Sequence, residues 1–157
     1  MYLPELNGGP QPVDVKIENL VRALTALGLK TYSSCEGHTD NENRPDERRH
    51  PYPWVTSRWS YKEDKLEKIV DMHNKLSNHP IKWEAVKSGF RGHLNPYIAN
   101  VLDKMSNNGE RISERWLKVL QDSAEELAHF IFDNRAISTC SDSDLIDKSI
   151  RRHSKKD

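Results

Sequence analysis

The sequence predicts a two-layer α+β domain, with a mostly antiparallel sheet of about four strands and helices packed on one face. Segments with helical and strand-like hydrophobic periodicity follow in the order helix, strand, strand, helix, strand, strand, helix. Consecutive strands usually pair with each other, and helices between such pairs cover one face. The length of 157 residues fits one domain, for which ~100–200 residues is typical. We expect that domain to span residues 1–134, with 1–12 as an irregular arm and 135–157 as a flexible polar tail.

The composition limits the classes of protein that fit. The chain has 24 basic and 24 acidic residues, so its total charge does not favour nucleic acid, although a local basic patch remains compatible. A hydrophobic content of 35% and a mean hydropathy of −0.85 predict a modest core with solvated loops. Two cysteines, Cys35 and Cys140, do not make a disulfide framework. With no signal peptide and no membrane-spanning apolar run, we expect a cytoplasmic protein without a membrane partner.

The first predicted elements are a helix and a short strand. Residues 13–27 carry apolar side chains at three- and four-residue spacing, which places them on one helical face. Asp14 suits the N-cap of this helix, and Gly28 suits its C-terminal stop because glycine tolerates a left-handed conformation. Residues 29–33 then favour a strand.

The middle of the chain predicts a long loop, a strand and a second helix. Residues 38–53 show no periodicity, which is typical of a mobile surface loop or a functional lid. The aromatic and β-branched residues at 54–59 predict a strand. Ser60 and Glu63 form a capping box that opens a helix, which we expect to end near Asn78, before a proline.

The last third predicts a hairpin and the longest helix. Alternation at 81–87 predicts a strand, and 89–94 can pair back with it. Asn95 and Pro96 could then cap and begin a short helix. After a break at Asn-Asn-Gly109, we expect a heavily buried helix at about 113–133. Its apolar stripe comprises Ile112, Trp116, Leu120, Ala124, Leu127 and Ile131.

Reactive side chains are concentrated between the first helix and the long loop. The stretch from Ser33 to His38 reads Ser-Ser-Cys-Glu-Gly-His, and we expect a turn there, at the end of the first strand. Its hydroxyls and free backbone amides can cradle an anion, and Gly37 permits a positive φ or close approach of the backbone to a ligand. Glu36 and His38 are a possible general base and acid. They can equally serve the turn alone.

Cys35 has three interpretations: a buried structural thiol, a ligand contact, and a nucleophile or metal ligand. The two-residue gap to His38 lets one turn supply two metal ligands, but zinc needs at least three protein ligands. His50, His93 or Glu36 could complete the set, but the sequence has no second paired motif such as Cys-x-x-Cys or His-x-x-x-His. We therefore predict no metal site and treat Cys35 and His38 as weak candidates only. No cofactor follows from the residues.

Arginines on regular elements are the best partners for an anion. Arg58 on a strand and Arg91 with His93 in the predicted hairpin can contact phosphate or carboxylate. Loop arginines among acidic residues are more typical of solvated charge. Trp54 can stack on a base, but strand spacing favours core packing for it.

Two resemblances are visible at these residues. Residues 27–38, the Pro-Tyr-Pro-Trp-Val at 51–55 and the stretch 121–127 resemble a group of small uncharacterised proteins with a Ser-Cys-Glu-Gly-His motif. This implies a shared site without naming its chemistry. More distantly, residues 31–38 are similar to the Ser-Ser-Cys-Ser-Gly-Arg signature of the wybutosine-synthesis tRNA methyltransferases. Glu36 and His38 depart from that signature, so S-adenosylmethionine-dependent methyl transfer is an alternative.

The sequence thus favours a small ligand-binding domain, with a polar pocket for a small anion such as a nucleotide or modified nucleoside. Ser33, Ser34, Glu36, Gly37 and His38 would line this pocket, and Arg58, Arg91 and His93 would approach from neighbouring strands. The alternatives are an enzyme, either methyltransferase-like or metal-dependent with Cys35, Glu36 and His38 as candidate catalytic residues, and a protein-interaction module without a pocket. Nucleic acid is a possible partner. The sequence does not decide whether the protein is an enzyme.

Overall fold

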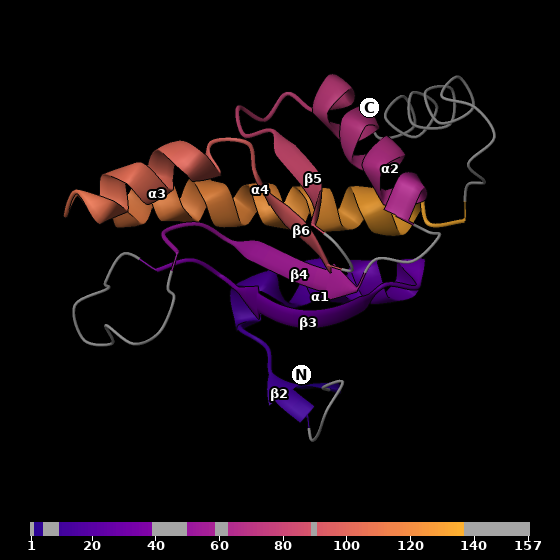
Figure 1. Ribbon diagram of the computed structural model, residues 1–157. Coiled ribbons are helices and arrows are strands. Elements are labelled where there is room, and N and C mark those ends of the chain that lie inside the picture. Colours follow the sequence, from indigo (N-terminus) through magenta and orange to yellow (C-terminus); the bar gives the residue numbers. More distant parts are fainter. Residues whose placement is uncertain (1, 5–9, 39–49, 59–62, 89–90, 137–157) are drawn as a thin grey trace.

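Four strands form one antiparallel sheet in the spatial order β3-β4-β6-β5 (Figure 1). They are β3 (Lys30–Cys35), β4 (Trp54–Arg58), β5 (Trp83–Ser88) and β6 (Arg91–Pro96). The computed structural model describes residues 2–4, 10–38, 50–58, 63–88 and 91–136. The α+β class and the antiparallel four-stranded sheet predicted from the sequence are confirmed.

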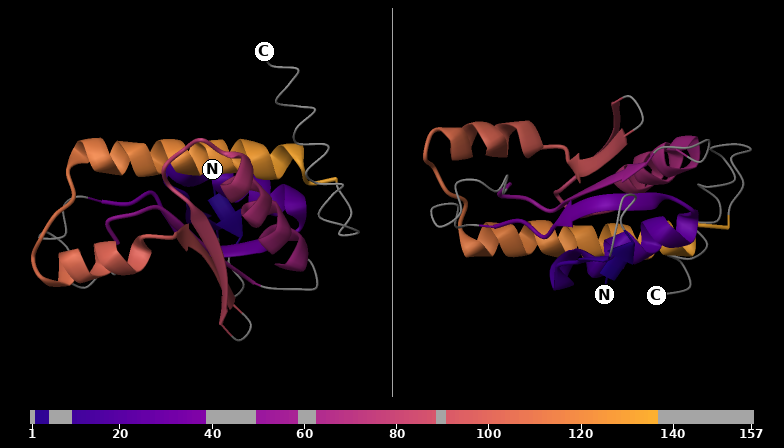
Figure 2. Two further views of the ribbon diagram at one scale, coloured as in Figure 1. Left: turned by 90° about the horizontal axis from the view of Figure 1, so that it is seen from above. Right: turned by 60° about the horizontal axis from the view of Figure 1, so that its bottom comes forward.

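The helices are η1 (Val15–Ile17), α1 (Glu18–Leu27), α2 (Glu63–Leu76), α3 (Ala99–Asn107) and α4 (Glu114–Asp133). The long helix α4 crosses the molecule behind the sheet and packs against both α1 and α2 (Figures 1 and 2). α3 lies at the end of the molecule where α4 begins. None of the helices that the structure describes combines the length and apolarity needed to cross a bilayer.

The two faces of the sheet differ in chemistry. Val55, Leu94 and Ala85 pair across three neighbouring strands and belong to or pack against the hydrophobic core. Successive residues of a strand point to opposite faces, so Thr56 and His93 lie on the face away from the core. We call that side the outer face. The core side also holds buried apolar residues of α1, α2 and α4, among them Leu20, Leu24, Ile69, Val70, Leu120, Leu127 and Ile131.

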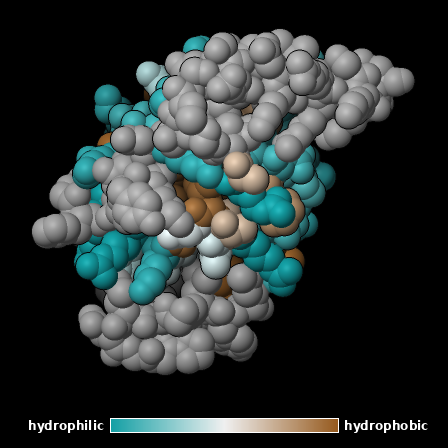
Figure 3. Space-filling view, turned by 90° about the vertical axis from the view of Figure 1, so that its right-hand side faces the viewer, coloured by the Kyte–Doolittle hydropathy of each residue, from teal (hydrophilic) through white to brown (hydrophobic). Residues whose placement is uncertain are grey.

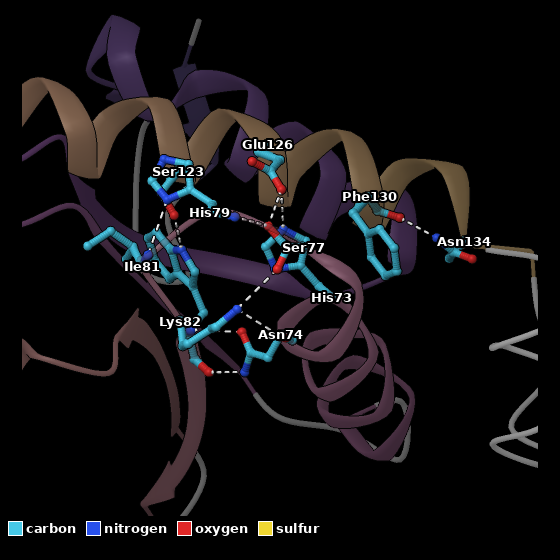
Figure 4. A network of polar contacts seen from close by, with 11 residues as sticks. His73, Asn74, Ser77, His79, Ile81, Lys82, Ser123, Glu126, Phe130 and Asn134 are labelled. Carbon is cyan, nitrogen blue, oxygen red and sulfur yellow. Dashed lines mark hydrogen bonds and ion pairs between the residues drawn. The ribbon is translucent and has the colours of Figure 1, made fainter. Parts of the chain in front are cut away.

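A polar network joins β5 to α2 and α4 within this core (Figure 4). Trp83 is 1% exposed, and its indole donates to the Ser123 hydroxyl of α4 at 2.7 Å. The Asn74 side chain of α2 donates to the Trp83 carbonyl at 2.7 Å and accepts from its amide at 3.0 Å. Lys82 donates to the Asn74 and Ser77 carbonyls, which satisfies acceptors left at the end of α2. The network fixes β5 against both helices.

His73 of α2 lies beside this network and is 1% exposed. Its Nε2 is 3.4 Å from the Glu126 carboxylate, and its ring contacts Phe130 edge-on. Burial lowers the pKa of His73, while the Glu126 carboxylate opposes that shift. The histidine is therefore favoured in its neutral form.

Several predicted boundaries are confirmed. Gly28 ends α1 with a φ of 100°, and its amide donates to the carbonyls of the last turn. Ser113 caps α4 by accepting from the Trp116 amide at 3.1 Å. α3 ends at Asn107, at the predicted break. Asp14 occupies an N-cap position, before η1, but its side chain makes no capping bond.

Other predicted boundaries are wrong. β3 runs two residues further than expected, because Ser34 and Cys35 continue the ladder with β4. β6 runs to Pro96, and the Tyr97 amide then bonds the Lys82 carbonyl at 2.7 Å, so α3 begins only at Ala99. The expected irregular arm contains a small antiparallel pair, β1 (Tyr2–Pro4) and β2 (Pro10–Pro12).

One residue predicted for the buried stripe of α4 is exposed in the structure. Trp116 is 55% exposed, whereas the other predicted stripe residues are buried. It lies in the first turn of α4, at the end of the molecule that extends past the sheet (Figure 1). Ser60 of the predicted capping box, Trp59, the loop at 39–49 and the tail from residue 137 lie outside the described residues.

Candidate functional site

The turn that follows β3 consists of Glu36, Gly37 and His38, and residues at the start of η1 and in α4 hold it by hydrogen bonds. The Glu36 amide donates to the Asp14 carboxylate at 3.2 Å, and the Glu36 carboxylate accepts from the Lys16 amide at 3.0 Å. The Gln121 side chain of α4 donates to the Glu36 carbonyl at 3.0 Å. Two separate segments, the start of η1 and α4, therefore fix the turn.

Gly37 is required at its position. Its φ is +87°, in the left-handed region that disfavours side chains. A Cβ there would lie 2.6 Å from Leu117 Cδ1 and 2.9 Å from the Tyr52 carbonyl carbon. The positive φ predicted for Gly37 is confirmed, and the close approach is to the protein's own core.

Three potential metal ligands converge at this turn. Asp14, Cys35 and His38 offer a carboxylate oxygen, a thiol sulfur and an imidazole nitrogen that lie within 4.8 Å of one another. Cys35 is 7% exposed, whereas Asp14 and His38 are half-buried. We call these residues the strand-end cluster. Neither His50, His93 nor Glu36, the residues that the sequence suggested, supplies the third group.

A hydrogen-bonded group of aromatic and acidic residues lies next to this cluster. The Tyr52 hydroxyl donates to Asp103 of α3 at 2.9 Å, and His50 Nδ1 lies 2.9 Å from the same carboxylate. The His38 amide donates to the His50 carbonyl at 3.2 Å. Burial, then Asp103 and Cys35, raise the pKa of the Tyr52 phenol. Tyr52 therefore stays protonated, as a donor to Asp103.

Ser33 and Ser34 do not belong to the turn. Both are strand residues, paired with Thr56 and Val55 respectively. Paired residues share a face of the sheet, so Ser33 lies on the outer face with Thr56, and Ser34 lies on the face of Val55. The predicted anion cradle of two serine hydroxyls and the turn amides is therefore wrong, because the two side chains diverge.

Arg58 and Arg91 lie at the opposite end of the strands from Cys35. Lys30 pairs with Arg58, and Arg58 with Arg91, whereas Cys35 pairs with Trp54. Five residues along a strand separate Lys30 from Cys35, which is roughly 16 Å. The single pocket predicted from Ser33–His38, Arg58 and Arg91 is thus divided into two groups.

The group at the far end forms a basic row on the outer face. Lys30, Arg58 and Arg91 are exposed and stand side by side on three adjacent strands. Arg91 also lies over the Tyr32 ring, with its Cζ 5.5 Å from the ring centroid. Among the residues that the structure describes, no ion pair neutralises the three cations. We call Lys30, Tyr32, Arg58 and Arg91 the basic row.

His93 lies between the two groups. It pairs with Thr56, and its Nδ1 is 3.0 Å from the Thr56 hydroxyl on the outer face. Ser33 is the neighbour of Thr56 on the other side. Hydroxyl and imidazole groups therefore extend the polar surface from the basic row toward the end of β3.

The sequence did not mark Asp14 or Lys30 as site residues. Asp14 stands 21 positions before Cys35 and carries the signature of a helix cap. Lys30 is an ordinary strand lysine until the register places it beside two arginines. Trp54, expected in the core, packs against it and meets the His50 ring edge-on.

Two shallow grooves lie elsewhere on the surface. One, of about 420 Å³, is lined by Asn74, Lys75, Pro80, Lys82, Tyr97 and Ile98, and the other, of about 270 Å³, by Asn19, Arg22, Ala23, Ala128, His129 and Phe132. At the end of the molecule at the right of Figure 1, the described residues in view are mostly hydrophilic around a small hydrophobic group (Figure 3). Single exposed apolar residues are normal on a protein surface. These features point to no particular ligand.

Comparison with known proteins adds no relative. No protein-family model matches the chain, and neither a curated protein nor a solved structure shows significant similarity to it.

Proposed function

We propose that this protein binds a phosphate-bearing ligand of the nucleotide class on the outer face of its sheet. The observation that carries the proposal is the basic row. Three exposed cations on adjacent strands, Lys30, Arg58 and Arg91, have no ion-pair partner among the described residues. Guanidinium groups suit two-point contact with phosphate oxygens.

The aromatic residue in the row supports a nucleotide over a simple anion. Tyr32 lies under the Arg91 guanidinium, so a base that stacks on either group stays next to the cations. The hydroxyl of Ser33 and the imidazole of His93 continue this surface. The hydroxyl and the imidazole can form hydrogen bonds with a ribose or with the edge of a base. The neutral total charge of the chain does not oppose this, because the row is a local concentration of charge.

Amide chemical shifts in a nucleotide titration test the proposal. Mononucleotides, single-stranded oligonucleotides and S-adenosylmethionine form separate arms, so the test separates a free nucleotide, a nucleic acid and the methyltransferase-like alternative. We expect shifts in β3, β4 and β6 residues of the outer face with at least one nucleotide arm. If the amide chemical shifts of the outer-face residues stay unchanged with every nucleotide, the proposal is wrong.

Charge variants locate the contact. Arg58→Gln and Arg91→Gln should each weaken binding, whereas Arg22→Gln, which removes an exposed arginine from α1, should not. If an oligonucleotide binds through all three cations, log Kd should depend on log salt with a slope of about 2, from ~0.7 per neutralised phosphate of a single strand. Each outer-face variant should lower that slope by ~0.7. An equal loss with Arg22→Gln would instead indicate non-specific attraction.

A further inference from the structure

We propose that Asp14, Cys35 and His38 form a site for a divalent metal ion of the zinc class, with a coordination position left for water or a substrate group. This inference goes beyond the proposed nucleotide function and does not depend on it. The three ligand atoms already lie within 4.8 Å of one another. In a tetrahedral zinc site, ligand atoms are about 3.3–3.6 Å apart, as follows from bond lengths of about 2.0–2.3 Å. Small side-chain movements would close the cluster around an ion.

The positions of the three residues are fixed by the backbone. Cys35 is the last residue of β3 and pairs with Trp54. Asp14 lies before η1, and its carboxylate makes no capping bond but accepts from the Glu36 amide at 3.2 Å. The His38 amide is held by the His50 carbonyl. The side chains therefore need little reorganisation to bind an ion.

The surroundings match those of a metal-bound thiolate. The Gly37 amide lies 3.4 Å from Cys35 Sγ and donates to it. Such amide bonds to sulfur and the bond from Glu36 to Asp14 orient metal ligands and hold them in place. Gly37 can occupy this position only because it lacks a Cβ.

The types of ligand select the ion. Thiolate and imidazole favour zinc and related transition metals, whereas magnesium and calcium prefer oxygen ligands throughout. The number of ligands indicates the kind of site. Structural zinc sites use four protein ligands, whereas catalytic sites use three and keep one position open. Among the described residues the cluster offers three, and the half-buried carboxylate and imidazole leave it accessible from solvent.

Metal titration of the full-length, chelator-treated protein tests the inference. We expect one equivalent of Zn²⁺ to bind in competition with a chromophoric chelator, and a large excess of Mg²⁺ not to displace it. Co²⁺ should give the near-ultraviolet charge-transfer band of a thiolate ligand. Absence of stoichiometric Zn²⁺ binding, or a Co²⁺ complex without that band, would overturn the proposal. Nucleotide titration of the metal-free protein keeps this test separate from the one above.

Matched variants identify the ligands. Asp14→Asn, Cys35→Ser and His38→Gln should each weaken Zn²⁺ binding by at least about 100-fold, since loss of an outer partner alone costs ~10–100-fold. Cys140→Ser and His129→Gln remove the same functional groups elsewhere and should leave affinity unchanged. Unaltered affinity in Asp14→Asn, or loss in Cys140→Ser, would overturn the assignment. Circular dichroism of each metal-free variant checks its fold, and if one is unfolded the Co²⁺ spectrum of the unmodified protein decides.

Discussion

Two clusters of polar side chains in this domain are built in opposite ways. The network around Trp83 runs from the buried indole and Ser123 to the half-buried Asn74 and Lys82, and its indole, amide and ammonium groups are bonded within the chain (Figure 4). The strand-end cluster of Asp14, Cys35 and His38 brings three ligand-type atoms together at a partly exposed turn. The first arrangement satisfies polar groups that burial would otherwise make costly. The second holds a carboxylate, a thiol and an imidazole where an ion or another molecule can reach them.

This difference gives a criterion for identifying functional residues from the structure. Some polar residues hydrogen-bond to the backbone of a neighbouring element, as the Asn74 side chain of α2 does with Trp83 of β5. The fold alone accounts for such residues. Arg58 and Arg91 on the outer face have no ion-pair partner among the described residues. The strand-end cluster brings a carboxylate, a thiol and an imidazole within 4.8 Å of one another, an arrangement that the fold alone does not require. Substitutions in the two clusters should separate stability from binding.

The largest effect on stability should come from Trp83→Ala. The side chain is 1% exposed, and its removal leaves a cavity and an unpaired Ser123 hydroxyl. We expect the free energy of unfolding to fall by about 3–5 kcal/mol, measured by urea denaturation. Trp83→Phe should lose less, because it keeps most of the packing. A loss below about 1 kcal/mol for Trp83→Ala would show that the network does not hold the fold.

Gly37→Ala should have the next largest effect. The positive φ alone costs about 1–3 kcal/mol for an ordinary side chain, and the new Cβ would also press on Leu117 and the Tyr52 backbone. Gly109→Ala is the matched control, since Gly109 has a similar φ of +79° with no atom within 4 Å of the added Cβ. Denaturation of both variants isolates the contribution of close packing at the turn. Equal losses would mean that the turn can relax away from α4.

The sequence predicted those parts of the structure that local chemistry determines. Gly28 and Ser113 end and begin helices because their own conformations and side chains do so. The relation between Cys35 and Arg91 depends instead on the order and direction of the strands. β4 pairs antiparallel with both β3 and β6, so the first residue of β6 lies at the same end of the sheet as the first residue of β3, far from Cys35 at its end. No local pattern encodes that pairing, so the sequence placed in one pocket residues that lie at opposite ends of the sheet. Asp14 was missed for a related reason: only the fold brings it beside Cys35.

The smallest expected effect concerns the pH dependence of stability at the edge of the buried network. His73 has a pKa lowered first by burial, with Glu126 opposing the shift. Below its ordinary value of 6.5, the unfolded chain binds a proton that the folded protein does not. Stability should therefore fall as the pH drops below 6.5 toward the lower folded pKa. Denaturant unfolding between neutral and mildly acidic pH measures this slope, and His73→Gln should reduce it. His129→Gln, an exposed histidine of α4 beside Glu125, is the control and should leave the slope unchanged. The same slope in His73→Gln and the unmodified protein would show that the Glu126 carboxylate fully compensates for burial. His73 would then accept a proton as readily in the folded protein as in the unfolded chain.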